Sequence, residues 1–356
     1  MSRRIVIMAG GTGGHVFPAL AVARELAARG WNVSWLGTRA GLEQRVTAAH
    51  GIEIDYLAVA GVRGKAARTK AAAGFRFILA CWQALRHLLR RKPRVVLGMG
   101  GFVAAPGGLM ARCLSIPLVI HEQNRAPGTS NRLLLKLAAP TVLQAFPESF
   151  PVSSRAQTVG NPLRAEFLSL PEKASDIWRV SCGRPLRILV IGGSLGAQIL
   201  NETIPEALAD MENIEVLHQT GAKMHQQVAD RYRELGLAAE VNPFIEDMAA
   251  AYQWADLAVC RAGAMTVSEL AAAGLPAILT PFPYAIDDHQ TANARYLCDG
   301  GGAVLLPQPE LSPLNLRAAI NAIKPELEAM SLAVKALARL EATQIVADIC
   351  AREALK

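Results

Sequence analysis

One pattern, a short apolar run followed by a glycine-rich turn and a helix, occurs near the start of each half of the chain. Residues 5–8 (IVIM) run into the turn AGGTGGH at 9–15, and residues 187–191 (RILVI) run into GGSLGA at 192–197. Glycine permits the close backbone approach and the positive φ that such turns need. The repeated pattern predicts two similar Rossmann-like α/β domains that face each other across a cleft.

Length and composition agree with two domains of this class. A chain of 356 residues corresponds to about two domains. A composition that is 51% hydrophobic but only 5% aromatic suits parallel strands covered by helices. The proline-containing segment 145–170 is expected to connect the domains. We therefore expect domains over 1–161 and 162–340, and a C-terminal helix over 341–356 that folds back on the first domain.

Several classes of protein are disfavoured by the same data. We expect no signal peptide, and no apolar run is near the roughly 18–20 residues that would span a bilayer. Six cysteines without a CxxC pair are expected to be reduced thiols of a cytosolic protein. The net charge of +7 suggests anionic partners. Few aromatic residues and no recognisable reading module argue against nucleic acid, which leaves phosphorylated ligands and an anionic membrane surface.

The first glycine turn does not fit a dinucleotide site. The G-x-G-x-x-G pattern would need glycine at Val16, and the second expected strand, 33–37, ends without the acid that would hold an adenosine ribose. A helix is expected over 19–29. His15 stands at the turn, and two interpretations stay open for it: a structural or merely exposed histidine, or a general base that titrates near neutrality.

A stretch in the second half predicts an anion site. An expected strand, 256–260, turns at 261–263 into a helix that begins at Thr266, and Glu269 lies at the spacing of a capping box. Backbone amides and the helix dipole at such a start attract anions. Thr266 and Glu269 could serve only as the cap, or Glu269 could also accept hydrogen bonds from sugar hydroxyls. The polar loop DDHQTAN at 287–293 favours the second interpretation.

Polar residues and glycines also follow expected strands of the first half. The strand 95–98 leads into Gly100-Gly101-Phe102, and the strand 117–120 leads directly into HEQN at 121–124. The carboxyl ends of parallel strands meet at one edge, where open α/β sheets bind ligands. The HEQN group is therefore predicted to contact a ligand rather than to serve only in packing.

Residues 67–92 form a long predicted helix whose main apolar stripe is expected to pack on the sheet. The stripe consists of Phe75, Ile78, Trp82, Leu85 and Leu89. Phe77, Cys81 and Leu88 widen the apolar arc beyond the ~100° that one contact needs. The basic residues around it are Arg68, Lys70, Arg76, Arg86, Arg90, Arg91 and Lys92. Two interpretations stay open: this surface rests on an anionic bilayer, or it is the solvated basic face of an ordinary helix.

Several segments occur in an order that resembles one family. They are GGTGGHVFPALA at 10–21, MGGFVAAP at 99–106, HEQN at 121–124, GNPLR at 160–164, GGSLGAQILN at 192–201, RAGAMTVSE at 261–269 and DHQTANA at 288–294. Together they resemble the bacterial N-acetylglucosaminyltransferases that convert lipid I to lipid II in peptidoglycan synthesis. The resemblance runs almost end to end. It implies a GT-B fold of two doubly wound parallel-sheet domains, and an inverting, metal-independent hexosyl transfer from UDP-N-acetylglucosamine.

The acceptor that the resemblance implies is the 4-hydroxyl of the N-acetylmuramyl-pentapeptide of undecaprenyl-diphosphate-linked lipid I. The domain over 1–161 would take this acceptor and face the membrane, and the domain over 162–340 would hold the donor. The resemblance thus implies a peripheral protein at the cytoplasmic face of the inner membrane. It implies neither a cofactor nor a metal, because UDP-N-acetylglucosamine is a substrate.

The resemblance also implies roles for individual residues, with His15 as the candidate base. Donor contacts are expected at Thr12, Gly13, Gly14, Asn124, Arg164, Ser194, Phe244, Ile245, Ala264, Met265, Thr266, Val267, Ser268, Glu269 and Gln290. Acceptor contacts are expected at Gly10, Gly11, Gly100, Gly101 and Phe102. From the pattern of the helix over 67–92, and not from the resemblance, membrane contacts are expected at Phe75, Phe77, Leu79, Trp82, Arg86 and Arg90. Phe102 stands where some relatives carry tyrosine, and His289 replaces a glutamine of some relatives, which leaves Gln290 as the sugar contact.

Inversion needs a single in-line displacement in which the acceptor hydroxyl loses a proton as UDP leaves. We predict that His15 takes this proton. The amides of 264–266, with Arg164, are predicted to stabilise the departing diphosphate in place of a divalent ion. A metal site at Asp287-Asp288 is the disfavoured alternative. The alternative functions are a UDP-sugar epimerase of the same fold, a non-catalytic sugar-nucleotide binding protein and a dehydrogenase.

Overall fold

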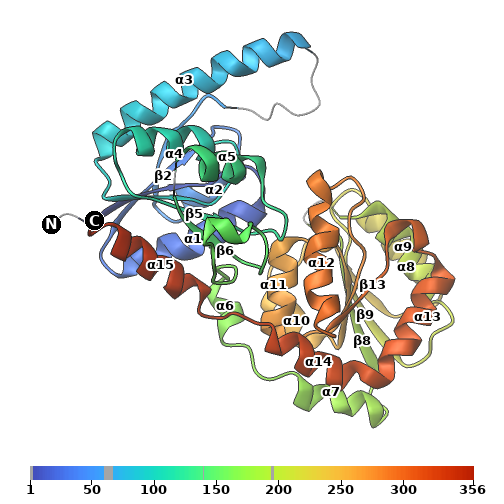
Figure 1. Ribbon diagram of the computed structural model, residues 1–356. Helices are drawn as coiled ribbons and strands as arrows, with labels where there is room; N and C mark the ends of the chain where they lie inside the picture. Colours follow the sequence, from blue (N-terminus) through green and yellow to red (C-terminus); the bar gives the residue numbers. More distant parts are fainter. Residues whose placement is uncertain (1–2, 60–66, 139, 194–195) are drawn as a thin grey trace. The chain divides into compact units, whose positions relative to one another are not determined.

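The computed structural model describes residues 3–59, 67–138, 140–193 and 196–356, which form two compact units. Unit 1 comprises Met1–Arg164 and Leu340–Lys356, and unit 2 comprises Ala165–Arg339. Each unit is an α/β domain with its own parallel sheet (Figure 1). This arrangement confirms the fold class predicted from the two strand–glycine–helix starts.

Unit 1 is built on a seven-stranded sheet in the order β3-β2-β1-β4-β5-β6-β7. Its strands are β1 (Arg4–Met8), β2 (Asn32–Gly37), β3 (Glu53–Tyr56), β4 (Val95–Gly98), β5 (Leu118–Glu122), β6 (Thr141–Gln144) and β7 (Gln157–Thr158). Its helices are α1 (Gly13–Ala28), α2 (Leu42–Ala49), α3 (Ala67–Arg91), α4 (Ala104–Cys113), α5 (Thr129–Leu137), the short η1 (Val152–Ser154) and α15 (Ala342–Glu353). Helices cover both faces of the sheet, so its strands are nearly continuous apolar runs.

Unit 2 is built on a six-stranded sheet in the order β10-β9-β8-β11-β12-β13. Its strands are β8 (Leu186–Ile191), β9 (Ile214–Gln219), β10 (Ala239–Asn242), β11 (Leu257–Cys260), β12 (Ala277–Leu279) and β13 (Ala303–Leu305). Its helices are α6 (Ala165–Leu168), α7 (Ala174–Ser181), α8 (Gln198–Leu208), α9 (His225–Glu234), α10 (Met248–Trp254), α11 (Ala264–Ala273), α12 (His289–Asp299), α13 (Pro313–Ile323) and α14 (Leu327–Ala336). Three short 3-10 segments, η2 (Ile286–Asp288), η3 (Gln308–Glu310) and η4 (Lys324–Glu326), join them.

Both sheets reverse their strand order beside their first strand. In unit 1 the chain places β2 and β3 on one side of β1 and then β4 on the other; in unit 2 it places β9 and β10 on one side of β8 and then β11 on the other. The carboxyl ends of the strands at such a reversal leave a crevice in which open α/β sheets bind ligands. The glycine turns found in the sequence lie at these two reversals.

Two helices begin earlier than the sequence suggested. Helix α1 begins at Gly13 rather than at residue 19, because Pro18 is tolerated inside the helix although it cannot donate a backbone hydrogen bond. Helix α11 begins at Ala264, and its N-cap residue, Gly263, provides no side-chain cap. The capping box predicted for Thr266 and Glu269 is therefore wrong, because Thr266 already lies inside the first turn.

The predicted orientation of α3 is also wrong. The face that packs on the core of unit 1 consists of Ala80, Ala84 and Leu88, at a spacing of four residues. The main apolar stripe faces outward instead, with Phe75 71%, Ile78 68%, Trp82 57% and Leu89 54% exposed. The small alanine side chains let α3 approach α4 closely, which explains why the narrower face is the buried one.

Among the described residues, no helix combines the length and the apolar character required to cross a membrane.

The last helix of the chain packs in the core of unit 1. Helix α15 contacts α1, and Val346, Ala347, Ile349 and Cys350 enter the same apolar cluster as Ile5 and Ile7 of β1. The chain thus leaves unit 1 at Arg164, forms unit 2, and returns at Leu340.

Truncating a buried residue of α15 should destabilise unit 1 selectively. Ile349 is 4% exposed, so Ile349→Ala removes buried apolar contacts worth about 2–5 kcal/mol. Hydrogen exchange under native conditions should accelerate at β1 and β4 and stay unchanged at β8 and β11. Gln344→Ala, at an exposed position of the same helix, is the control. Equal acceleration in both units would show that α15 does not belong to the core of unit 1.

Candidate functional site

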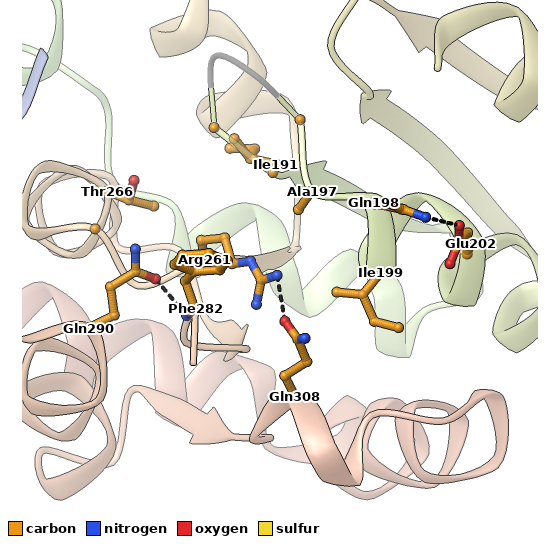
Figure 2. A pocket seen from close by; sticks show the side chains of 14 residues that line it. Ile191, Ala197, Gln198, Ile199, Glu202, Arg261, Thr266, Phe282, Gln290 and Gln308 are labelled. Carbon is orange, nitrogen blue, oxygen red and sulfur yellow. Dashed lines mark hydrogen bonds between the residues drawn. The ribbon is translucent and has the colours of Figure 1, made fainter. Parts of the chain in front are cut away.

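A pocket of about 690 Å³ opens in unit 2 at the carboxyl ends of β8 and β11, where the strand order reverses. Its wall includes the glycine turn after β8, the start of α8 and the start of α11. In Figure 2 the side chains of Thr266, Gln290, Arg261 and Gln308 come from separate segments that meet around this pocket. The pocket therefore collects polar groups that are distant in the sequence.

The start of α11 supplies backbone donors to this pocket. Gly263 and Thr266 line it, and the first N–H groups of a helix have no acceptor within the helix. Gly263 provides no capping side chain, so nothing from this residue covers the amides. A helix start of this kind attracts an anion, as the sequence analysis expected, although the helix begins at Ala264 and without the predicted capping box.

Arg261 is a functional candidate that the sequence analysis missed. Its guanidinium is half-buried and donates to the carbonyl oxygens of Thr280 (3.0 Å) and Pro281 (3.0 Å) and to Oε1 of Gln308 (2.7 Å), and it lies over the ring of Phe282. Burial lowers the pKa of Arg261. These acceptors are all neutral, so its positive charge favours an anionic ligand in the pocket. Its position directly after a strand at the reversal was the available signal.

Gln219 is a second missed residue, and it connects two loops at the edge of the sheet. At the end of β9, its Nε2 donates to the carbonyl oxygen of Gly193 (3.1 Å), and its Oε1 accepts from the backbone N–H of Ile245 (3.0 Å). One buried amide therefore fixes the glycine turn after β8 and the loop after β10 in relation to each other.

The predicted donor residues of unit 2 fall into three groups. Thr266 and Gln290 line the pocket, and Gln290 Oε1 accepts from the N–H of Phe282 at 2.9 Å. Ser194 lies outside the described residues. The remaining residues do not line the pocket: Phe244, Ile245, Ala264, Met265, Val267, Ser268 and Glu269.

The residues that do not line the pocket differ in burial and in hydrogen bonding. Val267 is fully buried, so its side chain packs in the core, whereas Phe244 is 57% exposed. Glu269 accepts a hydrogen bond from the hydroxyl of Tyr252 at 3.4 Å. Arg164, the last predicted donor contact, is the final residue of the first segment of unit 1.

In unit 1, two glycine turns approach each other where the strand order reverses. Gly100 and Gly101 follow β4 with φ of +96° and +78°. A Cβ at Gly101 would collide with the carbonyl oxygen of Gly10, and a Cβ at Gly100 would lie 3.0 Å from the ring of His15. Only glycine lets the second turn pack against the first turn and against the imidazole. The neighbouring Phe102 is 50% exposed.

Glu43 fixes the glycine turn after β1 through a hydrogen bond, and the sequence did not indicate this role. The fully buried side chain projects from α2. One carboxylate oxygen accepts from the N–H of Gly11 (3.2 Å), and the other accepts from the N–H (2.8 Å) and the hydroxyl (2.7 Å) of Thr38. Thr12 is the N-cap of α1 without a side-chain cap bond, and Gly13 and Gly14 form the first helical turn.

The HEQN group differs from its prediction. His121, Glu122 and Gln123 are each no more than 1% exposed, so they lie within the protein. Glu122 accepts from the N–H groups of Asn124 (3.1 Å) and Gly128 (2.9 Å) and from Nδ2 of Asn131 (2.9 Å), and thereby fixes the loop before α5. Asn124 is half-buried. The ligand-facing interpretation is wrong for the first three residues because neighbouring loops of unit 1 satisfy them.

His15 lies at the start of α1, and its side chain is half-buried. Its Nδ1 is 2.7 Å from Oε1 of Gln123. His121 Nε2 lies 2.9 Å from the carbonyl oxygen of Gly160, and Nδ2 of Asn161 donates to the carbonyl oxygen of Gln123 at 3.1 Å. The candidate base is therefore in contact, through Gln123, with the buried polar group at the end of β5.

The part of the chain that the structure describes contains no group of three or more histidine, cysteine, aspartate or glutamate side chains placed to hold a metal ion. Asp287 and Asp288, the disfavoured metal candidates, have left-handed backbone conformations. The Asp288 carboxylate accepts from the hydroxyl of Thr291 at 2.7 Å, which places it at the start of α12.

Comparison with known proteins gives matches over both units. The glycosyltransferase family 28 N-terminal domain matches residues 5–142, and the glycosyltransferase family 28 C-terminal domain matches residues 187–349. The UDP-N-acetylglucosamine–N-acetylmuramyl-(pentapeptide) pyrophosphoryl-undecaprenol N-acetylglucosamine transferase of Methylococcus capsulatus is 58% identical over 99% of each chain. The protein of the same name from Azotobacter vinelandii is 51% identical over 98% of each chain. The crystal structure of Acinetobacter baumannii MurG is 41% identical, with a TM-score of 0.87 over 98% of this chain and 99% of that chain.

Protonation of His121 should link the stability of unit 1 to pH. Burial lowers the pKa of this imidazole from 6.5 to about 4. Between these values the unfolded chain binds a proton that the folded chain does not, so stability falls by about 1.4 kcal/mol per pH unit as the pH decreases. Hydrogen exchange at β1, measured between pH 7 and 5 and corrected for the intrinsic exchange rate, should show this loss, and His121→Gln should reduce it.

The control for this measurement lies in unit 2, where burial lowers the pKa of His218 to about 3. Hydrogen exchange at β8 should keep its pH dependence in the His121→Gln protein. If the pH dependence at β1 is the same with and without His121, the imidazole does not stay neutral in the folded state.

Proposed function

The chain belongs to glycosyltransferase family 28, and on this premise we propose that it transfers N-acetylglucosamine from UDP-N-acetylglucosamine to N-acetylmuramyl-(pentapeptide) pyrophosphoryl-undecaprenol. The acceptor is lipid I and the product is lipid II of peptidoglycan synthesis. One observation carries this conclusion: relatives of that name are 58% and 51% identical to this chain from end to end.

We assign donor binding to unit 2. The pocket there combines the start of α11 with the glycine turn after β8 and the half-buried Arg261. A nucleotide diphosphate would be held by backbone N–H groups and by the guanidinium, all of which favour negative charge. Thr266 and Gln290 add side-chain hydrogen-bonding groups at the same pocket. These contacts would stabilise the diphosphate as it leaves, which is the role that oriented donors perform in transition states.

We assign proton transfer to His15 of unit 1. As the 4-hydroxyl of the acceptor attacks the sugar carbon, its O–H bond breaks and the imidazole takes the proton. The bond from the same carbon to UDP breaks in that step, so the configuration inverts. Imidazole suits this task because it exchanges protons near neutral pH. We further propose that no divalent ion takes part, since helix amides and Arg261 would supply the stabilisation of the diphosphate.

Replacing His15 should abolish most of the turnover without changing the affinity for the donor. UDP release from UDP-N-acetylglucosamine is measured with and without a lipid I analogue. We expect release that depends on the analogue, and we expect His15→Ala to reduce kcat roughly 10²–10⁴-fold while the Kd of the donor stays constant. His50→Ala, at an exposed histidine of the same unit, should leave kcat unchanged.

The same assay separates the alternatives. UDP release without an acceptor would indicate an epimerase, and stoichiometric binding without turnover would indicate a binding protein. Near-wild-type kcat in His15→Ala would refute the base assignment. Activity should persist in EDTA, and a large loss restored by a divalent ion would refute the metal-independent mechanism.

We also propose that the outward face of α3 rests on an anionic membrane surface, so that the protein is peripheral. Phe75, Ile78 and Trp82 are exposed large apolar side chains, and Arg76 and Arg86 are exposed beside them. The guanidinium of Arg86 lies 6.0 Å from the ring centroid of Trp82. Apolar side chains that enter the interface, with cations at the level of lipid phosphates, are typical of peripheral binding.

Arg90 is a poor choice for testing this surface, because it forms an ion pair with the buried Asp55. Phe77 and Leu79 are less exposed than Phe75, Ile78 and Trp82. Structural damage at these positions would be confused with a loss of membrane contact, so Trp82 and Arg86 are the better positions.

Binding to vesicles that contain anionic phospholipid should weaken with Trp82→Ser and with Arg86→Glu. A basic residue near such a surface contributes about 1 kcal/mol, so Arg86→Glu should reduce the partition coefficient by about fivefold or more, and added salt should reduce the difference. The controls are Leu314→Ser and Arg24→Glu, at exposed positions on other helices. Equal binding of all four variants in co-sedimentation would refute the proposed membrane face.

A further inference from the structure

We propose that Gln123, backed by His121, is a positioning residue that holds His15 in the tautomer with Nδ1 protonated and Nε2 free to accept a proton. The proposal rests on the function assigned to His15 above. It concerns residues of unit 1 only: His15 at the start of α1, His121 in β5, Gln123 just after β5, and Gly160 after β7.

The hydrogen bonds form a continuous chain between these residues. Nδ1 of His15 lies 2.7 Å from Oε1 of Gln123. Nε2 of Gln123 lies 3.0 Å from Nδ1 of His121 and 3.0 Å from the carbonyl oxygen of His121. Nε2 of His121 lies 2.9 Å from the carbonyl oxygen of Gly160.

Two backbone carbonyl oxygens determine which atom donates at each step, because a carbonyl oxygen can only accept. The carbonyl of Gly160 requires a proton on Nε2 of His121. The neutral imidazole of His121 then has a lone pair on Nδ1, which requires the NH₂ group of Gln123. The carbonyl of His121 itself imposes the same orientation on that amide.

The orientation of Gln123 decides the tautomer of His15. With its NH₂ group facing His121, the amide presents Oε1 to His15, so Nδ1 of His15 must be the donor. A neutral imidazole with a proton on Nδ1 has its lone pair on Nε2. Nε2 of His15 is thus the atom that can take a proton, and it is not the ring nitrogen bonded to Gln123.

Burial keeps this series of hydrogen bonds in a single protonation pattern. His121 is fully buried and Gln123 is 1% exposed, and burial favours the neutral form of His121 by lowering its pKa to about 4. The backbone of Gln123 is itself held by Nδ2 of Asn161. The ring of His15 is confined on another side by Gly100, where a Cβ would lie 3.0 Å from Cε1 and Nδ1.

The arrangement matches what proton abstraction needs. When Nε2 takes the proton of the acceptor hydroxyl, Nδ1–H keeps its hydrogen bond to Gln123, so the imidazolium forms without rearrangement of the chain. A wrong tautomer would present N–H to the hydroxyl and could not accept its proton. Gln123 therefore acts through His15 and need not touch the substrate.

The tautomer can be measured directly in the wild-type protein. Nitrogen NMR of the full chain labelled at histidine distinguishes protonated from unprotonated ring nitrogens, and His15→Ala identifies the resonances. We expect Nδ1 of His15 protonated and Nε2 unprotonated at pH 8, without any substrate. A proton on Nε2 instead would overturn the proposal, whatever the variants do.

Gln123→Met should remove the constraint while keeping the volume of the side chain. We expect resonances of both tautomers of His15 and a decrease of kcat of roughly tenfold or more, within the roughly 10²–10⁴ that general base catalysis contributes. The KM of UDP-N-acetylglucosamine should stay within about twofold, since binding that is lost equally from ground and transition states would appear in KM. An unchanged tautomer and an unchanged kcat would overturn the proposal.

The matched control is Gln144→Met. Gln144, at the end of β6, is another buried glutamine of unit 1, and it donates to the hydroxyl of Thr158 (2.9 Å) and accepts from the N–H of Phe150 (3.0 Å). This variant should keep the His15 tautomer and kcat even if it lowers stability. If it lowers kcat as much as Gln123→Met does, the effect is a general one on the fold and the proposal is wrong.

His121→Phe tests the second link. It should reduce kcat less than Gln123→Met, and it should have no further effect in the Gln123→Met protein, because the two residues act in series. If the losses of kcat from the two substitutions add in the double variant, the two residues do not act in series and the proposed series of hydrogen bonds is contradicted. If wild-type UDP release does not depend on the acceptor, the proposed function fails, whereas the NMR result still decides the positioning of His15.

Discussion

Close contact between backbone segments at the carboxyl edge of each sheet is the constraint on which both sites depend. In unit 1 the turn after β4 lies so near the turn after β1 that a Cβ at Gly101 would collide with the carbonyl oxygen of Gly10. In unit 2 a Cβ at Gly196 would collide with the carbonyl oxygen of Thr220. Both glycines have positive φ. Backbone N–H groups can gather around a ligand at these places because no side chains separate the turns.

Buried polar side chains then fix the turns in place. Glu43 binds the N–H of Gly11 in unit 1, and Gln219 joins Gly193 to Ile245 in unit 2. Gln123 likewise fixes the side chain of His15 through a hydrogen bond. Each of these residues is at most 3% exposed. A buried polar group is costly when it lacks a partner, so the loops and the groups beneath them hold each other in a single arrangement.

Two helices of unit 1, α15 and α3, cover opposite faces of its sheet and differ in which of their side chains are buried. Helix α15 closes the core on the face of the sheet that α1 also covers, whereas α3 closes the opposite face with small alanine side chains. Using alanines for packing leaves the large apolar residues of α3 outside. This distribution is unfavourable for an isolated protein in water, and it is the physical basis for assigning that face to a membrane surface.

The sequence by itself determined the fold class, the position of both glycine turns and the place of His15 beside the first turn, because glycine requirements and apolar runs are local properties of the chain. Thr266 and Gln290 were indicated by the family resemblance, and only the fold of unit 2 brings them to the pocket beside the second turn. Only the tertiary structure decided which apolar face of α3 is buried, since both faces are apolar and the choice depends on how closely α4 approaches. It also decided that His121, Glu122 and Gln123 face inward, and that Glu43, Gln219 and Arg261 belong to the sites. Their hydrogen-bond partners come from segments distant in the sequence, and no local pattern records that proximity.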